Sequence, residues 1–169
     1  MSVLITGSGL YTPKEVISNE ELVACFNAYV DQYNLDNQEC IQSGELEPLV
    51  HSDTDFIKKV SGIEQRFVLD KKGILDPDRM SPDLKERSNE EISIQAEIAI
   101  DACKKAMEDA GRSANEIDAV ICGCANLQRA YPAVAIEIQE ALNIEGYAYD
   151  MNVACSSSTF AIQNACNDI

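Results

Sequence analysis

Cys155 is the residue whose type and setting could most readily do chemistry. It follows the segment 147–152, which predicts a strand, and it begins a helical pattern that continues to Asn167. A cysteine at such a join lies at a helix N-terminus, where unpaired N–H groups and the helix dipole favour the thiolate. The same N–H groups could stabilise the oxyanion that forms when sulfur attacks a thioester. A buried structural cysteine is the alternative that these local features leave open.

The other cysteines do not form a recognisable ligand set. The chain has seven cysteines and a single histidine, His51. The remaining six lie in predicted helices, apolar strands or a polar stretch, without a CxxC pair or the tight spacing of zinc ligands. We therefore expect no metal site. A cysteine hydrolase would need a histidine within reach of Cys155, and we interpret His51 as a surface residue.

Composition limits the partners and the compartment. The chain has 169 residues, a formal net charge of −16 and a pI of about 4.2, with 46% hydrophobic residues. This is globular composition, and so acidic a chain is a poor partner for nucleic acid or an anionic membrane. No signal peptide precedes the first predicted strand and no apolar run reaches the length of a membrane span. We expect a reduced, cytoplasmic protein.

The order of the predicted elements indicates a layered α/β domain with a largely parallel sheet covered by helices. Capping boxes at Ser18–Glu21 and Ser88–Glu91 predict two helix starts, and Gly111 ends the second helix. Two polar stretches, 31–52 and 70–87, are interpreted as insertions. The remaining predicted strands cover 3–9, 63–69 and 119–125, and the remaining helices cover 54–60 and 132–142.

Several segments, in order along nearly the whole chain, carry a family resemblance. They are Ile5-Thr6-Gly7-Ser8-Gly9-Leu10-Tyr11-Thr12-Pro13, Ser18-Asn19-Glu20-Glu21-Leu22, Asp55-Phe56-Ile57, Ser61-Gly62-Ile63-Glu64-Gln65-Arg66, Ala130-Tyr131-Pro132-Ala133, Ile138-Gln139 and Asn152-Val153-Ala154-Cys155-Ser156. Together they resemble the N-terminal half of a β-ketoacyl-acyl carrier protein synthase III, a condensing enzyme with the thiolase fold. The resemblance implies one N-terminal thiolase-like half-domain over 1–169, with the C-terminal half absent from this chain.

The resemblance implies an acyltransferase of fatty acid biosynthesis. Cys155 would accept an acyl group from acyl-CoA, and decarboxylative condensation with malonyl-acyl carrier protein would give a β-ketoacyl-acyl carrier protein. The histidine and asparagine that the family uses for decarboxylation belong to the C-terminal half. The expected partners are therefore acyl-CoA, acyl carrier protein and a second copy in a homodimer, with no cofactor beyond the substrates.

Three further site residues follow from the resemblance. Phe56 matches the aromatic residue that packs on the CoA adenine, or it is a core residue of a short helix. Tyr131 matches an aromatic residue that crosses the dimer interface and closes the partner's acyl pocket, or it packs at a helix start. Arg66 matches an arginine that contacts phosphate or forms a structural salt bridge.

The two insertions and the run 127–132 resemble a subgroup that uses medium-chain primers, of the β-ketodecanoyl synthase type. We therefore hypothesise an octanoyl-like primer; surface decoration is the alternative explanation of the insertions. Two other functions stay open. One is another thiolase-fold acyl-CoA condensing enzyme, such as a hydroxymethylglutaryl-CoA synthase, and the other is a non-catalytic dimerisation half-domain.

Overall fold

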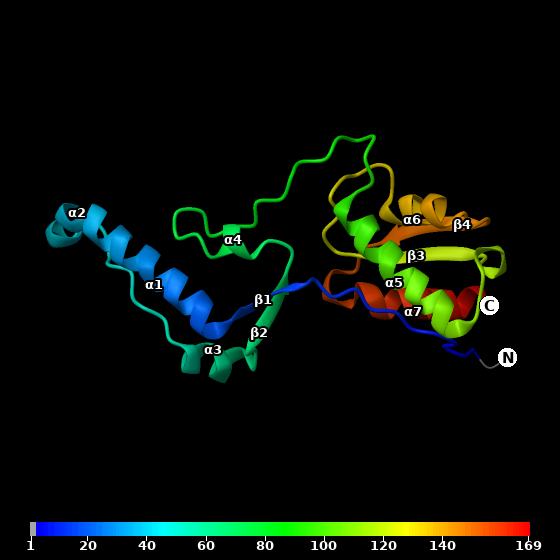
Figure 1. Ribbon diagram of the computed structural model, residues 1–169, viewed down its shortest axis with the longest axis horizontal. Coiled ribbons are helices and arrows are strands. Elements are labelled where there is room, and N and C mark those ends of the chain that lie inside the picture. Colours follow the sequence, from blue (N-terminus) through cyan, green and yellow to red (C-terminus); the bar gives the residue numbers. More distant parts are fainter. Residues whose placement is uncertain (1–2) are drawn as a thin grey trace. The chain divides into compact units, whose positions relative to one another are not determined.

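The computed structural model describes residues 3–169, which form two compact units. Unit 1 consists of residues 3–11 and 87–169, and unit 2 consists of residues 12–86 (Figure 1). Unit 1 contains the strand-to-helix join at Cys155. The boundaries of the two insertions remain a prediction.

Unit 1 is built on a pair of parallel strands between helices (Figure 1). Strand β3 (Ala119–Gly123) pairs along its whole length with β4 (Tyr147–Met151), and helix α6 (Val134–Leu142) connects them. Helix α5 (Ile94–Ala110) packs on α6, and helix α7 (Ser157–Asp168) packs on β3. The predicted strands 119–125 and 147–152, the helix 132–142 and the parallel pairing are confirmed.

The side chains of β3 alternate between two apolar layers. Val120 and Cys122 pack against the buried cluster of α5 and α6, whereas Ala119 and Ile121 line a hollow of about 650 Å³ beside α7. A strand covered on both faces has no polar side, which explains its continuous apolar sequence. The buried cluster consists of Ala96, Ile100, Val134, Ile138, Leu142 and Ile144.

The prediction of a strand over residues 3–9 is wrong. This segment has no strand pairing within residues 3–169 and lies along helix α5 instead. The amide of Ser8 donates to Asp109 Oδ2 at 2.9 Å, and a Cβ on Gly9 would collide with the Ala102 carbonyl. The predicted burial is wrong as well, because Val3, Leu4 and Ile5 are exposed, and it is the backbone at Gly7 and Gly9 that comes close to the helix.

Helix α5 begins later than its predicted capping box. The amide of Ser88 donates to the Glu91 carboxylate at 2.9 Å, so half of the box forms, but it closes an isolated turn. The helix starts at Ile94, where the Ser93 hydroxyl accepts from the Ala96 amide. Gly111 ends the helix in the left-handed conformation, as predicted.

In unit 2 two antiparallel strands and four helices occur among the described residues. Strand β2 (Gln65–Val68) and helix α3 (Thr54–Ser61) confirm the predicted strand and helix, and the Ser18 capping box opens α1 as predicted. Strand β1, which pairs with β2, was not predicted, and much of the polar stretch 31–52 is helical. The other bounds are β1 Glu15–Ser18, α1 Asn19–Asp36, α2 Gln38–Ser43 and α4 Lys71–Ile74.

Two asparagines of α1 order the segment that returns from α2. Asn34 exchanges two hydrogen bonds of 2.9 Å with the backbone of Leu49. Asn27, two turns earlier on the helix, does the same with Ser52. A side-chain amide can pair with a peptide group in this way because it carries both a donor and an acceptor. The segment is therefore held to α1 by asparagine side chains of that helix rather than by an apolar core.

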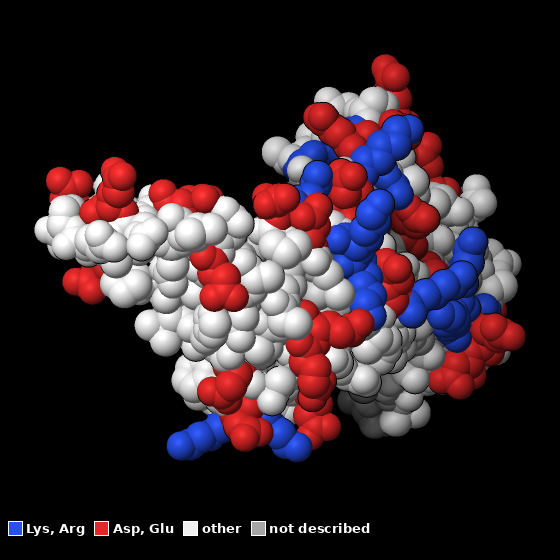
Figure 2. Space-filling model, turned by 60° about the vertical axis from the view of Figure 1, so that its left-hand side comes forward, with Lys and Arg blue, Asp and Glu red and all other residues white. Residues whose placement is uncertain are grey.

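Where Lys and Arg side chains are visible in Figure 2, Asp and Glu side chains lie among them, and other parts of this surface carry acidic side chains only. On α5, for example, Lys105 lies 2.6 Å from Asp101, and past its end Arg112 lies 2.6 Å from Glu116. No helix among residues 3–169 is both long enough and apolar enough to cross a bilayer.

Replacing Gly9 with alanine should destabilise the protein, because the added methyl group has no room against the α5 backbone. We expect Gly9→Ala to lower the free energy of unfolding by roughly 1–3 kcal/mol, as overpacking does elsewhere. The neighbouring control, Ser8→Ala, keeps the hydrogen bond from the backbone amide of residue 8 to Asp109, and it should change the free energy of unfolding by less than about 0.5 kcal/mol. Urea denaturation measures both, and equal effects would contradict the close packing of this segment on α5.

Candidate active site

Cys155 lies in a single turn between β4 and α7, with its side chain exposed. The turn, η2 (Ala154–Ser156), is a 3-10 turn that leads directly into α7. Ala154 has a φ of 48°, in the left-handed region that residues with a Cβ rarely adopt. Such strain is retained where the surrounding structure enforces it, and it is frequent at functional sites.

The hydroxyl of Ser157 enforces this turn. Ser157 is 4% exposed, and its Oγ accepts from the Val153 amide at 2.9 Å and donates to the Ala154 carbonyl at 2.7 Å. On the other side of the turn, Asn152 Oδ1 accepts from the Ala154 amide at 3.1 Å. Sequence reasoning missed these two positioning residues, although Asn and Ser beside a tight turn are the types that close it through side-chain bonds.

The amides of the turn differ in what they bond. Ser156 donates to the Val153 carbonyl, and Ser157 donates to the Ala154 carbonyl. The Cys155 amide has no acceptor within residues 3–169. An exposed thiol therefore lies beside an N–H group that can donate to a ligand.

The loops that follow β3 and β4 meet at one edge of the sheet. The amide of Cys124 donates to the Met151 carbonyl at 3.0 Å, and the Asn152 side chain reaches the Ala125 carbonyl at 3.4 Å. A Cβ on Gly123 would lie 2.7 Å from the Ser157 carbonyl, so the end of β3 touches the start of α7. Parallel strands bring their carboxyl ends together, which is where α/β proteins build sites.

Tyr131 belongs to the loop after β3, so it comes to the same edge of the sheet as Cys155. Its side chain is 85% exposed, which does not fit a residue packed at a helix start. The following helix, α6, has no side-chain cap of its own; instead Asp150 of β4 accepts from the Val134 amide at 2.9 Å and the Ala135 amide at 2.8 Å. The carboxylate thereby stabilises the positive end of that helix.

The most buried of the other cysteines are held as thiols. Burial, with a contribution from the Asp150 carboxylate, raises the pKa of Cys122 to about 11. Burial also raises the pKa of Cys25 and of Cys103 above the ordinary value. A thiol is a poor nucleophile and a poor metal ligand. Within residues 3–169 no group of His, Cys, Asp and Glu side chains is arranged to hold a metal ion.

Phe56 and Arg66 lie in unit 2. Phe56, on α3, is 58% exposed and so is not a core residue of that helix. Arg66, on β2, donates from Nη1 to Asn19 Oδ1 at 2.9 Å, and Asn19 is buried. This contact gives Arg66 a structural partner, while its proposed phosphate contact stays a prediction. His51 lies in the same unit and bonds Asp31 at 2.7 Å.

Comparison with known proteins identifies the relatives of this chain. No family model matches it. The β-ketodecanoyl-[acyl-carrier-protein] synthase of Pseudomonas aeruginosa is 60% identical over 140 residues, which cover 83% of this chain and 40% of that protein. The chain is homologous to the β-ketoacyl-[acyl-carrier-protein] synthases III. A member of this family from Bacillus cereus is 27% identical over 166 residues, or 98% of the chain and 39% of that protein.

Solved structures show that the fold is that of the thiolase-like condensing enzymes. The 3-oxoacyl-[acyl-carrier-protein] synthase III of Aquifex aeolicus matches with a TM-score of 0.64 at 23% identity, over 95% of this chain and 38% of that one. An OleA structure from Xanthomonas campestris with bound lauric acid and lauroyl-CoA matches with a TM-score of 0.65 at 16% identity, over 96% of this chain and 38% of that one. The chain thus spans about two fifths of the length of the synthase III relatives it matches.

The contrast between the exposed and buried cysteines predicts an order of alkylation. At pH 8 iodoacetamide should modify Cys155 before Cys122, because the latter is partly buried and only about a thousandth ionised when its pKa is about 11. Raising the pH towards 11 should speed the modification of Cys122 as its thiolate forms. Peptide mass mapping over time measures the order; modification of Cys122 as fast as Cys155 at pH 8 would contradict the assignment of exposure.

Proposed function

We propose that the protein containing this chain is a β-ketoacyl-acyl carrier protein synthase III type acyltransferase, with Cys155 as its nucleophile. The observation that carries the proposal is the exposed Cys155 thiol on a strained turn, next to an amide without an acceptor among the described residues. The homology to synthases III supports the reaction type.

In the proposed acylation step, the Cys155 thiolate attacks the thioester carbonyl of acyl-CoA. The Cys155 amide stabilises the resulting oxyanion, and the CoA thiolate leaves and takes up a proton. In the condensation step, malonyl-acyl carrier protein loses CO₂, and the carbanion attacks the acyl-cysteine. This attack releases the Cys155 thiolate and β-ketoacyl-acyl carrier protein. No cofactor takes part in either step of the proposal.

The chain supplies the nucleophile but not the groups that the family uses for decarboxylation. Its one histidine, His51, lies in unit 2 and is bonded to Asp31. The proposed mechanism takes the histidine and the asparagine from the C-terminal half of the family, as the resemblance implies. The proposed partners are acyl-CoA, an acyl carrier protein and a second copy of the protein, and the proposed compartment is the cytoplasm, which fits seven free cysteines.

A medium-chain primer is the finer part of the proposal. Its support is the 60% identity to a β-ketodecanoyl-[acyl-carrier-protein] synthase, compared with 27% to a β-ketoacyl-[acyl-carrier-protein] synthase III. We propose that Phe56 contacts the CoA adenine, that Arg66 lies near its phosphates and that Tyr131 crosses the dimer interface and closes the acyl pocket of the partner subunit. An octanoyl group would give a ten-carbon product after one condensation.

A related acyl-CoA condensing enzyme without an acyl carrier protein is the second candidate. An OleA structure whose bound ligands include lauroyl-CoA has a TM-score of 0.65, and the Aquifex aeolicus synthase III structure has 0.64, so similarity of fold alone does not favour the carrier-protein-dependent enzyme. The sequence identity favours the carrier-protein-dependent enzyme, because the β-ketodecanoyl-[acyl-carrier-protein] synthase is 60% identical to this chain and the OleA structure is 16% identical.

The proposed function is tested by incubating the full-length protein with labelled acetyl-, octanoyl- and lauroyl-CoA, followed by malonyl-acyl carrier protein. We expect octanoyl-CoA to acylate Cys155 fastest and a β-ketodecanoyl product to form. Cys155→Ala should lower turnover by at least about 10³-fold, since no other group replaces the nucleophile. Cys166→Ala, in the helix α7 that follows the Cys155 turn, should retain acylation. A clear preference for acetyl-CoA would refute the medium-chain primer, and acylation of Cys155→Ala would refute the nucleophile.

A further inference from the structure

A buried arginine joins the loop after β3 to the turn before α5. Arg129 donates from Nη1 to the Asn89 carbonyl at 3.0 Å and from Nη2 to the Glu91 carbonyl at 2.9 Å. Its side chain is only 9% exposed. The planar fork of a guanidinium can serve two carbonyls at once, which a lysine ammonium cannot do with the same geometry. The isolated turn at Ser88–Glu91 thus provides two acceptors for Arg129.

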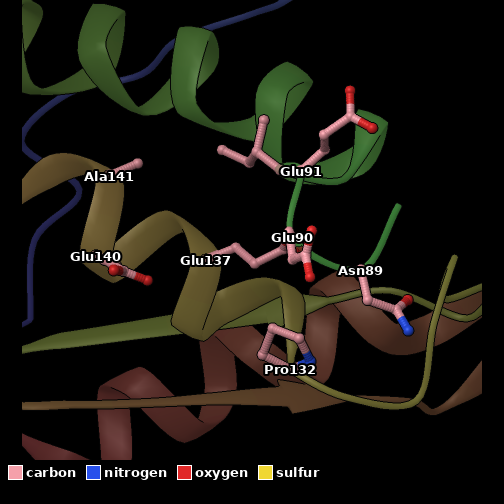
Figure 3. Close-up of a pocket in the computed structure, with 8 residues that line it drawn as sticks. Asn89, Glu90, Glu91, Pro132, Glu137, Glu140 and Ala141 are labelled. Carbon is pink, nitrogen blue, oxygen red and sulfur yellow. The ribbon is translucent and has the colours of Figure 1, made fainter. Parts of the chain in front are cut away.

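Glu137 of α6 provides the counter-charge. Its carboxylate lies 4.0 Å from Arg129 Nη2 and is 8% exposed. It accepts from the Ser93 amide at 2.8 Å and from the Ser93 hydroxyl at 2.6 Å, so it also holds the start of α5. Figure 3 shows Glu137 extending from α6 towards the segment that carries Asn89 and Glu90, across a cavity of about 280 Å³. A buried charge that loses its partner is costly, so this arrangement resists partial opening.

Two glutamines hold the same loop just before Arg129. The backbone amide of Gln128 donates to Gln95 Oε1 at 2.6 Å, and the backbone amide of Ile94 donates to Gln128 Oε1 at 2.9 Å. The Gln95 side chain also donates to the Asn126 carbonyl. The loop is therefore anchored to the start of α5 through Asn126, Gln128 and Arg129, and Tyr131 comes two residues later.

The exposed Tyr131 ring is placed by its backbone rather than by packing of its own, since its side chain is 85% exposed. The backbone is fixed on one side by Arg129 and on the other by α6, which carries Glu137. We propose that Arg129 is a positioning residue for acyl-chain selection: with Glu137 it fixes where Tyr131 projects. This inference rests on the proposed function and deepens it.

The test compares Arg129→Gln, Arg129→Lys and the control Arg112→Gln in the full-length protein. Arg112 forms an exposed ion pair with Glu116, so its loss should matter little. Hydrogen exchange of the amides in 126–131 measures the loop, with the amides of α7 as the internal reference. The ratio of kcat/KM for octanoyl-CoA over acetyl-CoA measures chain selection, and separate KM and kcat values show where any change lies.

Arg129→Gln should speed exchange in 126–131 by about 10- to 100-fold, the range expected for lost hydrogen bonds to a charged group. It should lower the octanoyl-to-acetyl ratio by about 10-fold through a higher KM for octanoyl-CoA, while exchange in α7 stays unchanged. Arg129→Lys should fall between the wild type and Arg129→Gln, and Arg112→Gln should match the wild type in both measurements.

An unchanged chain-length ratio or unchanged loop exchange in Arg129→Gln would overturn the inference while leaving the proposed function intact. If Arg129→Gln does not fold, Arg129→Lys decides, and wild-type behaviour of that variant in both measurements would overturn the inference. A wild-type protein that never acylates Cys155 would instead refute the proposed function, and the role in chain selection with it.

Discussion

The buried Ser157 hydroxyl is the group on which the geometry around Cys155 depends. It bonds the backbone on both sides of Ala154, whose left-handed conformation costs roughly 1–2 kcal/mol for a residue with a Cβ. Hydrogen bonds of this kind contribute about 1 kcal/mol each, so the two together can offset that strain. Because the turn is held from the buried side, the Cys155 side chain is left exposed and its amide is left without a partner among residues 3–169.

The parallel pairing of β3 and β4 places the loop after β3 beside the Cys155 turn. β3 and β4 run parallel, so the Cys155 turn and the loop bearing Tyr131 begin at the same edge. Asp150 of β4 caps α6, and Glu137 of α6 faces Arg129, so the helix after the Tyr131 loop and the arginine within that loop each meet a carboxylate from another element. Both loops that the proposed chemistry uses are thus held by side-chain hydrogen bonds to the backbone, as a preorganised site requires.

The sequence was sufficient to predict the join at Cys155, because the apolar pattern changes there from strand to helix spacing. It was not sufficient for residues 3–9, since the apolar run predicts a buried strand, whereas its side chains Val3, Leu4 and Ile5 are exposed and its glycines lie against the α5 backbone. The Ser88 capping box does not begin α5, although its turn forms. Arg129, which is remote in sequence, bonds the backbone of that turn, and the Ser93 hydroxyl caps the helix instead. The strain at Ala154 leaves no sequence pattern of its own. The roles of Phe56, Arg66 and Tyr131 remain predictions drawn from the family resemblance.

The conformation of Ala154 is the most direct test of the account, because the exposure of Cys155 follows from it. Glycine adopts a positive φ without a Cβ clash, so Ala154→Gly should keep the free energy of unfolding within about 0.5 kcal/mol of wild type, strain relief offsetting the greater freedom of the unfolded chain. Ala154→Val adds β-branching at the same φ and should lower it by about 1–2 kcal/mol. Urea denaturation of both variants decides the point. A loss of about 1 kcal/mol or more in the free energy of unfolding of Ala154→Gly, with no loss for Ala154→Val, would contradict the left-handed turn that presents Cys155.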